Sequence, residues 1–176
     1  MHALGRLSLV PVWFAAFATG CSLALDWRQV RPEGGAVVVL LPCKPERRTR
    51  PVVLADVPVT VEVLACSAGG TTWGMTSADL GEPARVGPAL AVLRAARSRN
   101  LDGRESEVHA VRIAKLSSEP PPLRLRIDGR KPDGQPIVEH SLLLAEGSRV
   151  FHLAALGGAP SAAALETFFD SLEPAR

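Results

Sequence analysis

Apolar and polar residues alternate along much of the chain with the two-residue period of β-strands. Residues 57–65 place four valines on one side of a predicted strand and a threonine and a glutamate on the other. Residues 123–127 alternate leucine or isoleucine with arginine in the same way. Residues 36–41 are continuously apolar and stop at Pro42, which predicts a strand buried on both faces.

Turn residues separate further strands and predict antiparallel hairpins. Ala55-Asp56 joins a strand at residues 48–54 to the valine-rich strand, and residues 71–77 form a third strand of this group. Pro132-Asp133-Gly134 leads into a strand at residues 137–144, because proline fixes φ and glycine accepts positive φ. Glu146-Gly147 then leads into residues 149–156, so the C-terminal half is predicted to be a three-strand meander.

Two segments have helical patterns. Residues 88–100 begin with proline, which suits the first turn of a helix, and carry arginines in the final turns, where the helix dipole favours cations. Residues 161–172 have the stronger pattern, since Leu165, Phe168, Phe169 and Leu172 recur at helical spacing. We expect these four side chains to close the core against residues 123–156.

The order of strands, helix, strands and helix predicts an α+β fold. We expect a layered sandwich, made of a mostly antiparallel sheet with two flanking helices. The chain has 176 residues, and the 156 that follow the first twenty are enough for one domain of ordinary size. We assign residues 27–176 to this single domain.

The N-terminus has the composition of an export signal. His2 and Arg6 precede an apolar run of about a dozen residues. This run is too short for a membrane-spanning helix, which needs ~20 residues. Ala18-Thr19-Gly20-Cys21 follows and resembles the lipobox of bacterial lipoproteins, in which small residues precede an acylated cysteine. The resemblance implies that residues 1–20 are a lipoprotein signal peptide and that Cys21 is the lipidation site. One departure is Ala18, where leucine is commoner.

The alternative is an ordinary signal cleavage that leaves Cys21 unmodified. Under the lipoprotein interpretation, residues 21–26 are a short tether, and two or three acyl chains anchor it stably in the membrane. We therefore expect the protein in the bacterial cell envelope, lipid-anchored and facing the periplasm. Ser22 permits sorting to the outer membrane, which we favour slightly over the inner membrane.

The cysteine count fits export. The chain has three cysteines, and lipidation of Cys21 leaves Cys43 and Cys66 as a pair that an oxidising compartment can join. The predicted hairpin places Cys66 opposite the segment around Pro45, close to Cys43. A disulfide there would stabilise the fold by roughly 3 kcal/mol through loop closure. Two unpaired thiols are the alternative.

The pattern from Trp27 to Leu172 is similar to the small PsbP-like domains, including the DcrB-type envelope lipoproteins. The shared features are an early strand that ends in Leu41-Pro42, a helix before Asn100-Leu101, and a terminal helix that contains residues 169–172. The resemblance implies a PsbP-like fold and a binding or accessory role, and it transfers no site residue. An unrelated α+β fold is the alternative.

Charge and motifs exclude several functions. The formal charge of +2 falls to +1 without Arg6, which argues against a nucleic-acid partner because such proteins need a basic face. Neither the segment around Ser148 nor the glycines of residues 67–74 match a nucleophile elbow or a phosphate loop. We predict no catalytic residue and no cofactor site. Trp27 and Trp73 are expected to be core anchors.

Three histidines follow the predicted signal, at positions 109, 140 and 152. A turn at Glu146-Gly147 would pair His140 with Leu153 and His152 with Ser141, which places these two histidines on opposite faces of the sheet. Metal ligands must converge on one point, so we expect no metal site. His109, His140 and His152 are instead predicted to face solvent or to be satisfied in the core.

These patterns predict a non-enzymatic envelope lipoprotein that binds or supports another envelope protein or assembly. The alternative is a carrier of a small apolar or lipid ligand, held in a cavity between the sheet and the helices. An unfilled pocket lined by leucine and phenylalanine would favour the carrier. A filled core with an exposed apolar patch would favour the protein-binding role.

Overall fold

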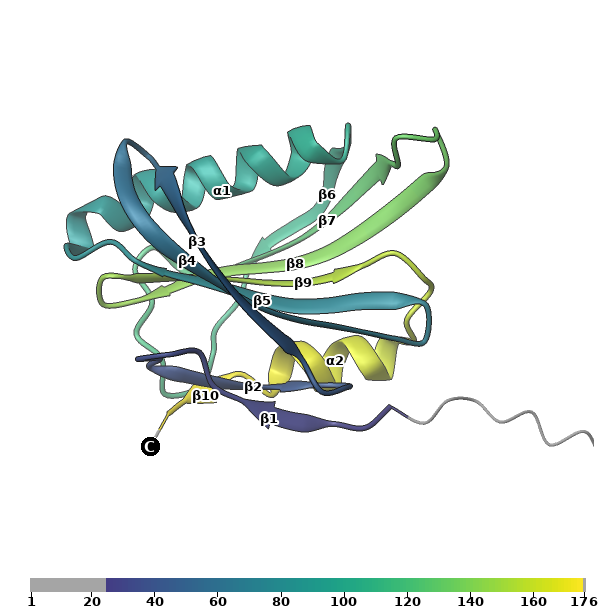
Figure 1. Cartoon of the computed structure of the whole chain (residues 1–176), viewed down its shortest axis with the longest axis horizontal. Coiled ribbons are helices and arrows are strands. Elements are labelled where there is room, and N and C mark those ends of the chain that lie inside the picture. The colour runs from purple at the N-terminus through teal and green to yellow at the C-terminus, as the bar shows by residue number, and fades with distance from the viewer. Residues whose placement is uncertain (1–24, 176) are drawn as a thin grey trace, which may run out of the picture.

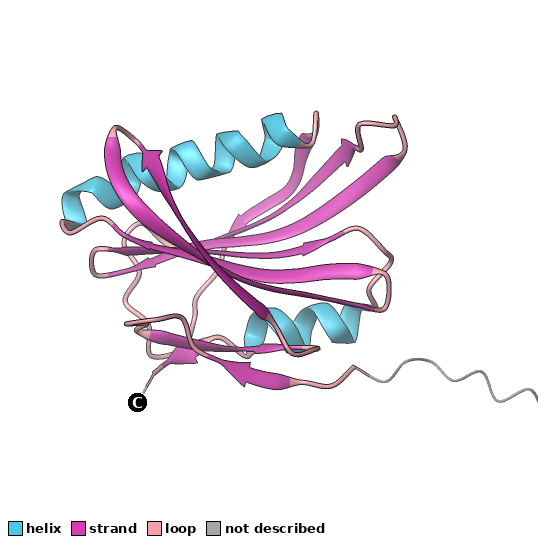
Figure 2. Ribbon diagram, in the orientation of Figure 1, coloured by secondary structure: helices cyan, strands magenta, loops and turns pink. Residues whose placement is uncertain are grey.

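The protein folds into three layers in the computed structural model, which describes residues 25–175 (Figures 1 and 2). The middle layer is a seven-stranded sheet in the order β3-β4-β5-β9-β8-β7-β6. Helix α1 (Val86–Asn100) covers one face of this sheet. Helix α2 (Ala162–Asp170) and a small sheet cover the other face. The predicted α+β class, with a mostly antiparallel sheet and two flanking helices, is therefore confirmed.

All neighbouring strands of the large sheet are antiparallel. The first three strands form two hairpins, and Ala55 and Asp56 adopt positive φ at the predicted first turn. The helix α1, preceded by a 3-10 turn at Pro83–Arg85, carries the chain from β5 to the far edge at β6. The strands are β3 (Glu46–Leu54), β4 (Val57–Ala68), β5 (Thr71–Asp79), β6 (Arg104–Ala110), β7 (Leu123–Arg130), β8 (Pro136–Glu146) and β9 (Arg149–Leu156).

The small sheet corrects the prediction for residues 36–41. Strand β2 (Val37–Leu41) is the middle strand of this sheet, between β1 (Arg28–Val30) and β10 (Glu173–Pro174). Its alternate residues Val37, Val39 and Leu41 are buried, whereas Val38 and Leu40 are only half-buried. The strand is therefore buried on one face, because the small sheet is an outer layer and its second face is partly open to solvent.

The C-terminal meander has four strands rather than three. The additional strand, β6, pairs with β7 along the edge of the large sheet. Its sequence, RESEVHA, lacks apolar alternation because the strand is mostly exposed and is held by main-chain pairing. Charged residues on an edge strand also oppose pairing with a second molecule.

Two cores lie on the two faces of the large sheet. The larger one joins that sheet to the small sheet and α2, and it contains Trp73, Phe151 and Phe168, each at most 1% exposed. The ring of Phe168 meets Trp73 edge-on, with centroids 5.2 Å apart, and Trp27 contacts the same indole. Trp73 is thus the predicted core anchor, whereas Trp27 is half-buried at the margin.

The terminal helix closes this core as predicted, with two adjustments. Phe168, Phe169 and Leu172 are buried, but Leu165 is only half-buried. The helix contacts β2 as well as the meander, and it ends at Asp170, so Leu172 lies just beyond it. The hydroxyl of Ser161 accepts a hydrogen bond from the Ala164 amide and caps the N-terminus of the helix.

Replacement of Phe168 by alanine tests this packing. We expect Phe168→Ala to lower the free energy of unfolding by about 3–5 kcal/mol, because it removes a fully buried ring and leaves a cavity against Trp73. Thermal or urea unfolding measures the change. The exposed Glu166→Ala on the same helix is the control and should leave the transition almost unmoved. Equal stability of both variants would contradict the packing.

Candidate functional site

The predicted disulfide is present. Cys43 follows β2 in the small sheet and Cys66 lies in β4 of the large sheet, and their sulfur atoms are bonded. The bond therefore joins two layers of the fold across a sequence separation of 23 residues. The remaining cysteine, Cys21, the lipobox and the predicted signal peptide lie outside the described residues.

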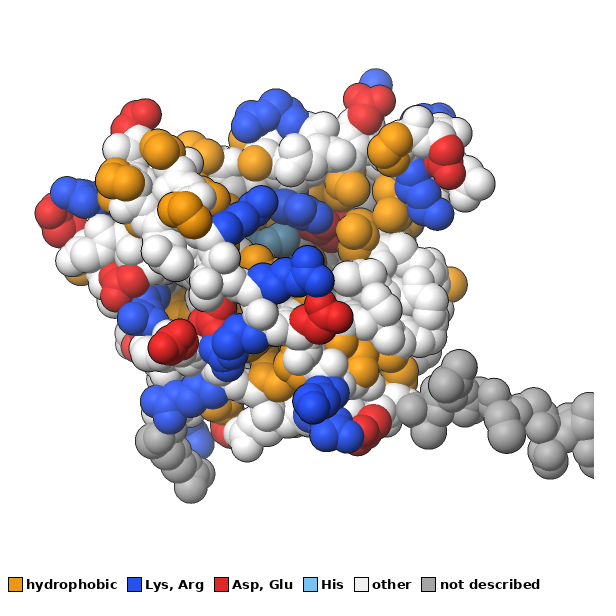
Figure 3. Space-filling model, in the orientation of Figure 1, with side chains coloured by type: hydrophobic (Ala, Val, Ile, Leu, Met, Phe, Trp, Pro, Cys, Tyr) orange, Lys and Arg blue, Asp and Glu red, His pale blue; other side chains and the backbone are white. Residues whose placement is uncertain are grey.

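A buried polar cluster lies between α1 and the large sheet. Glu139 and Ser141 project from β8, His152 from β9 and Arg97 from α1, and the first three side chains are 0%, 1% and 6% exposed. Arg97 contacts the Glu139 carboxylate through both Nε and Nη2. The hydroxyl of Ser141 lies 2.6 Å from Glu139 Oε1 and 3.0 Å from His152 Nε2. Figure 3 shows a hollow beside α1 with a histidine in it and basic side chains at its rim.

The residue types in this cluster match a serine–histidine–acid triad, but their proton arrangement does not. The ionised carboxylate of Glu139 can accept hydrogen bonds but cannot donate them, so the Ser141 hydroxyl donates to it. His152 Nε2 must then donate to Ser141, whereas a catalytic histidine takes a proton from its serine. Ser141 is also 1% exposed in the middle of a strand. The cluster fits a structural role between helix and sheet.

The Glu139 carboxylate is kept ionised by its neighbours. Burial by itself would raise the pKa of Glu139, but the hydrogen bonds and positive charge of His152 and Arg97 outweigh it and lower the pKa to about 2. The negative charge thus persists throughout the physiological range. If one charged side chain of such a buried group is removed, its partner stays buried without a compensating charge. The free energy of unfolding then falls.

The cluster explains the arginines of α1. The sequence pattern related the arginines of this helix to the helix dipole, and in the structure Arg94 and Arg97 also reach the sheet. Arg94 forms two hydrogen bonds of 2.8 and 3.0 Å from Nε to the carboxylate of Glu105 in β6, and Ser98 donates to the same carboxylate. The second half of α1 is therefore held by ion pairs, which a search for apolar periodicity does not detect.

The histidine pairing differs from the prediction by two residues. The β8–β9 turn lies at Gly147-Ser148, so His140 pairs with Ala155 and His152 pairs with Leu143. An even shift preserves the side of every residue, and the two histidines lie on opposite faces as predicted. His152 is satisfied in the core, whereas the third histidine, His109, is exposed.

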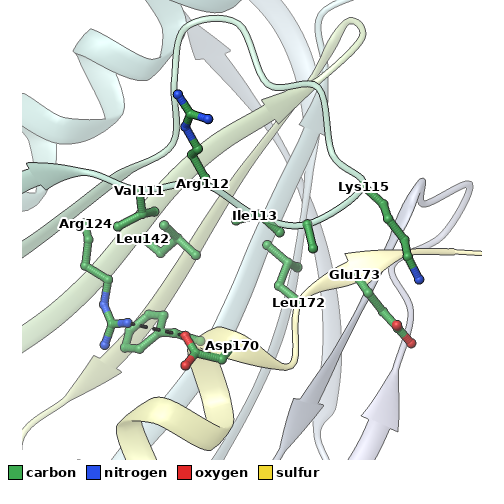
Figure 4. A pocket seen from close by; sticks show the side chains of 11 residues that line it. Val111, Arg112, Ile113, Lys115, Arg124, Leu142, Asp170, Leu172 and Glu173 are labelled. Carbon is green, nitrogen blue, oxygen red and sulfur yellow. Dashed lines mark ion pairs between the residues drawn. The ribbon is translucent and has the colours of Figure 1, made fainter.

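A second candidate site lies on the other face, where the loop after β6 meets the end of α2. It is a pocket of about 270 Å³, which we call the Arg124 pocket (Figure 4). Three buried side chains form its floor: Leu142, Phe169 and Leu172. Val111 and Ile113 of the loop line the side toward β6 and β7.

The charged residues of this pocket are unevenly placed. The Arg124 guanidinium stacks on the Phe169 ring, with Cζ 3.9 Å from the ring centroid, which is cation–π geometry. Asp170 lies 3.9 Å from Arg124 Nη1 and is itself 74% exposed in its side chain. Lys115 and Glu173 lie on the opposite rim, and Arg112 points away from the floor in Figure 4. Burial lowers the pKa of Arg124, and the charges of Asp170 and Glu166 partly offset this effect.

The rest of the described chain adds two observations. Within residues 25–175, no helix is both long and apolar enough to span a membrane. In the same range, no three histidine, cysteine, aspartate or glutamate side chains converge as metal ligands would. The space between the large sheet and α2 is occupied by the side chains of the larger core.

Comparison with known proteins adds the fold class alone. No family model matches the sequence, and no curated protein matches it. A crystal structure of a protein from Bacteroides thetaiotaomicron resembles the fold with a TM-score of 0.50 and 10% sequence identity. The match covers 84% of this chain and 48% of that protein, so this chain spans about half of its length. The protein is thus an α+β sandwich domain, and this likeness carries no function.

Sequence reasoning missed the members of both sites. A signal for the buried cluster was available: Glu139 lies in a strand rich in apolar residues, and a buried carboxylate requires partners. The partner Arg97 could not be identified, because it lies 42 residues away on a helix. No comparable signal marked the Arg124 pocket, since four separate segments form it.

The cluster predicts an acid-sensitive stability. Because the pKa of Glu139 falls from the usual 4.5 to about 2 on folding, its ionised form contributes about 3 kcal/mol at neutral pH. This contribution is lost as the pH falls from about 5 toward 2. Glu139→Gln should lose it at pH 7 and flatten the pH dependence of urea unfolding below pH 5. The exposed Glu166→Gln should retain the wild-type dependence, and an unchanged profile in Glu139→Gln would contradict the cluster.

Proposed function

We propose that the protein is a lipid-anchored, non-enzymatic component of the bacterial cell envelope that binds or supports another envelope protein. The observation that carries this proposal is the Cys43–Cys66 disulfide. Disulfides persist in oxidising compartments such as the periplasm. The bond uses two of the three cysteines and leaves Cys21, at the lipobox, available for acylation.

The position of the domain relative to Cys21 supports the anchor. The described domain begins at Leu25, whose side chain packs at the edge of the larger core. Only Ser22, Leu23 and Ala24 separate it from Cys21, which corresponds to less than ~15 Å of extended chain. A domain tethered so closely would remain at the membrane surface, where it can reach other envelope proteins. Outer-membrane sorting is slightly favoured by Ser22.

The packing between the layers favours a protein partner over the carrier alternative. The interior that a carrier would need is filled by Trp73, Phe151 and Phe168 among others. The Arg124 pocket, at about 270 Å³, is slightly smaller than pockets that enclose drug-sized ligands, which measure ~300–1,000 Å³. It suits one side chain of a partner better than a whole lipid.

A PsbP-like relationship is part of this proposal. The described fold has the features on which the resemblance rests: an early strand that ends at Leu41, a helix that ends at Asn100, and a terminal helix through Phe169. These features are shared by the accessory domains of that family.

Lipidation can be tested by substitution of the cysteine. Cys21→Ala should abolish incorporation of labelled palmitate in bacterial cells and leave the protein unprocessed or released from the membrane, because the thiol that accepts the diacylglycerol is gone. The double variant Cys43→Ala/Cys66→Ala keeps Cys21 and should still be labelled. Persistent labelling of Cys21→Ala would refute the lipoprotein assignment.

The partner and carrier roles predict that different molecules co-purify with the protein. After mild detergent extraction, cross-linking and mass spectrometry should identify a stoichiometric envelope protein, because the proposed role is protein binding. Organic extraction of the same sample should yield no stoichiometric apolar ligand beyond the lipids of a control lipoprotein. A ligand bound at one equivalent, without a protein partner, would establish the carrier role instead.

A further inference from the structure

Arg124 is a partly buried cation that forms a long ion pair with Asp170 but no hydrogen bond within the described residues. Its side chain is 25% exposed, and within residues 25–175 none of its five N–H donors makes a hydrogen bond. The nearest carboxylate oxygen, on Asp170, is 3.9 Å away, which is beyond hydrogen-bond distance. By contrast, Arg94 and Arg97 on the other face each bind a carboxylate directly. Arg124 therefore holds donors at the pocket that no described residue uses.

The position of the guanidinium is fixed by its surroundings. Its Cζ lies over the ring of Phe169, 3.9 Å from the centroid, and Phe169 is itself only 2% exposed, so a fixed side chain supports the cation. A planar guanidinium presents its donors in a fork that matches a carboxylate with two parallel hydrogen bonds. The desolvation that lowers the pKa of Arg124 would be offset by such an anion.

The surface beside this cation is apolar. Leu142 and Leu172 continue the floor from Phe169, and Val111 and Ile113 stand beside them. A ligand that satisfies both parts must carry a carboxylate next to an apolar group. The volume of about 270 Å³ accommodates one apolar side chain with its carboxylate, and the pocket is partly open to solvent.

We propose that the Arg124 pocket binds the C-terminal carboxylate of a partner protein whose last residue is aliphatic or aromatic. This inference rests on the protein-binding role proposed above and specifies its chemistry. The Arg124 guanidinium donates hydrogen bonds to the carboxylate, and the last side chain packs on Phe169, Leu142 and Leu172. The rim carries charges of both signs, since Lys115 is basic whereas Asp170 and Glu173 are acidic. Terminal carboxylate capture of this kind is an established mode of peptide recognition.

Isothermal titration of the purified full-length protein in detergent tests the pocket. The probes are acetyl-Gly-Gly-Leu with a free carboxylate, the same peptide as its C-terminal amide, and hexanoate. The peptide with a free carboxylate should bind at least about ten-fold more tightly than the amide. The neutral amide has one oxygen in place of two and carries no charge, so it cannot accept two charge-assisted hydrogen bonds from the guanidinium. It should also bind more tightly than hexanoate. Equal affinity of the amide, or of hexanoate, would overturn the proposal, the latter in favour of a small apolar acid.

Two variants locate the binding. Arg124→Gln should abolish the preference for the carboxylate over the amide. Arg126→Gln is the matched control, since Arg126 lies two residues along the same strand and face but is already bonded to Asp128. It should retain the wild-type preference. Retention of the preference by Arg124→Gln would refute the site, and the amide comparison on the wild-type protein holds even if that variant folds poorly.

Cross-linking in cells separates this inference from the proposed function. A partner captured equally by wild type and Arg124→Gln would leave the protein-binding role intact and refute the pocket. If the titration shows a preference for the carboxylate but no partner is captured in cells, the pocket binds carboxylates as inferred and the protein-binding role is refuted. Loss of the captured partner in Arg124→Gln, but not in Arg126→Gln, would support both.

Discussion

The central strands of the large sheet are buried on both faces, and the rest of the architecture follows from that constraint. In β8, Leu142 and Leu144 enter one core, whereas Leu143 and Ala145 enter the other. A sheet with two apolar faces must be covered twice, because neither face can be left in water without a large loss of hydrophobic stabilisation. Helix α1 covers one face, and the other requires both α2 and the small sheet. The disulfide between Cys43 and Cys66 links that second cover to the large sheet.

The two covers are attached by different physical means. The layer of α2 and the small sheet is apolar, with Phe168 against Trp73 at its centre. Helix α1 is short of large apolar residues in its second half and relies on Arg94 and Arg97, which pair with Glu105 and Glu139. Such pairs fix the position of a helix by directed hydrogen bonds, and they make its attachment sensitive to acid. The serine and histidine in this cluster serve the same attachment.

The Arg124 pocket lies where the large sheet, through Arg124 of β7 and Leu142 of β8, meets the loop after β6, the end of α2 and the start of β10. The last two belong to the layer that also contains β1, which follows the proposed lipid tether directly. Part of the candidate binding site thus lies in the same outer layer as the strand that follows the proposed tether. A protein held at the membrane by this layer would present the pocket to neighbours in the envelope rather than to molecules that diffuse through a cavity.

The sequence alone determined the local features. Alternation identified β4 and β7, turn residues located Ala55-Asp56, and helical spacing placed Phe168 and Phe169 in the core, because these patterns depend on contacts that recur within a few residues. The cysteine count also identified the Cys43–Cys66 pair, because lipidation of Cys21 would leave these two of the three cysteines to bond with each other. Only the tertiary structure assigned β2 to a separate sheet, revealed the exposed edge strand β6, and brought Arg97 to Glu139 and Arg124 to Phe169. Those relations join segments tens of residues apart, and main-chain pairing or a single long-range ion pair leaves no periodic signal in the sequence.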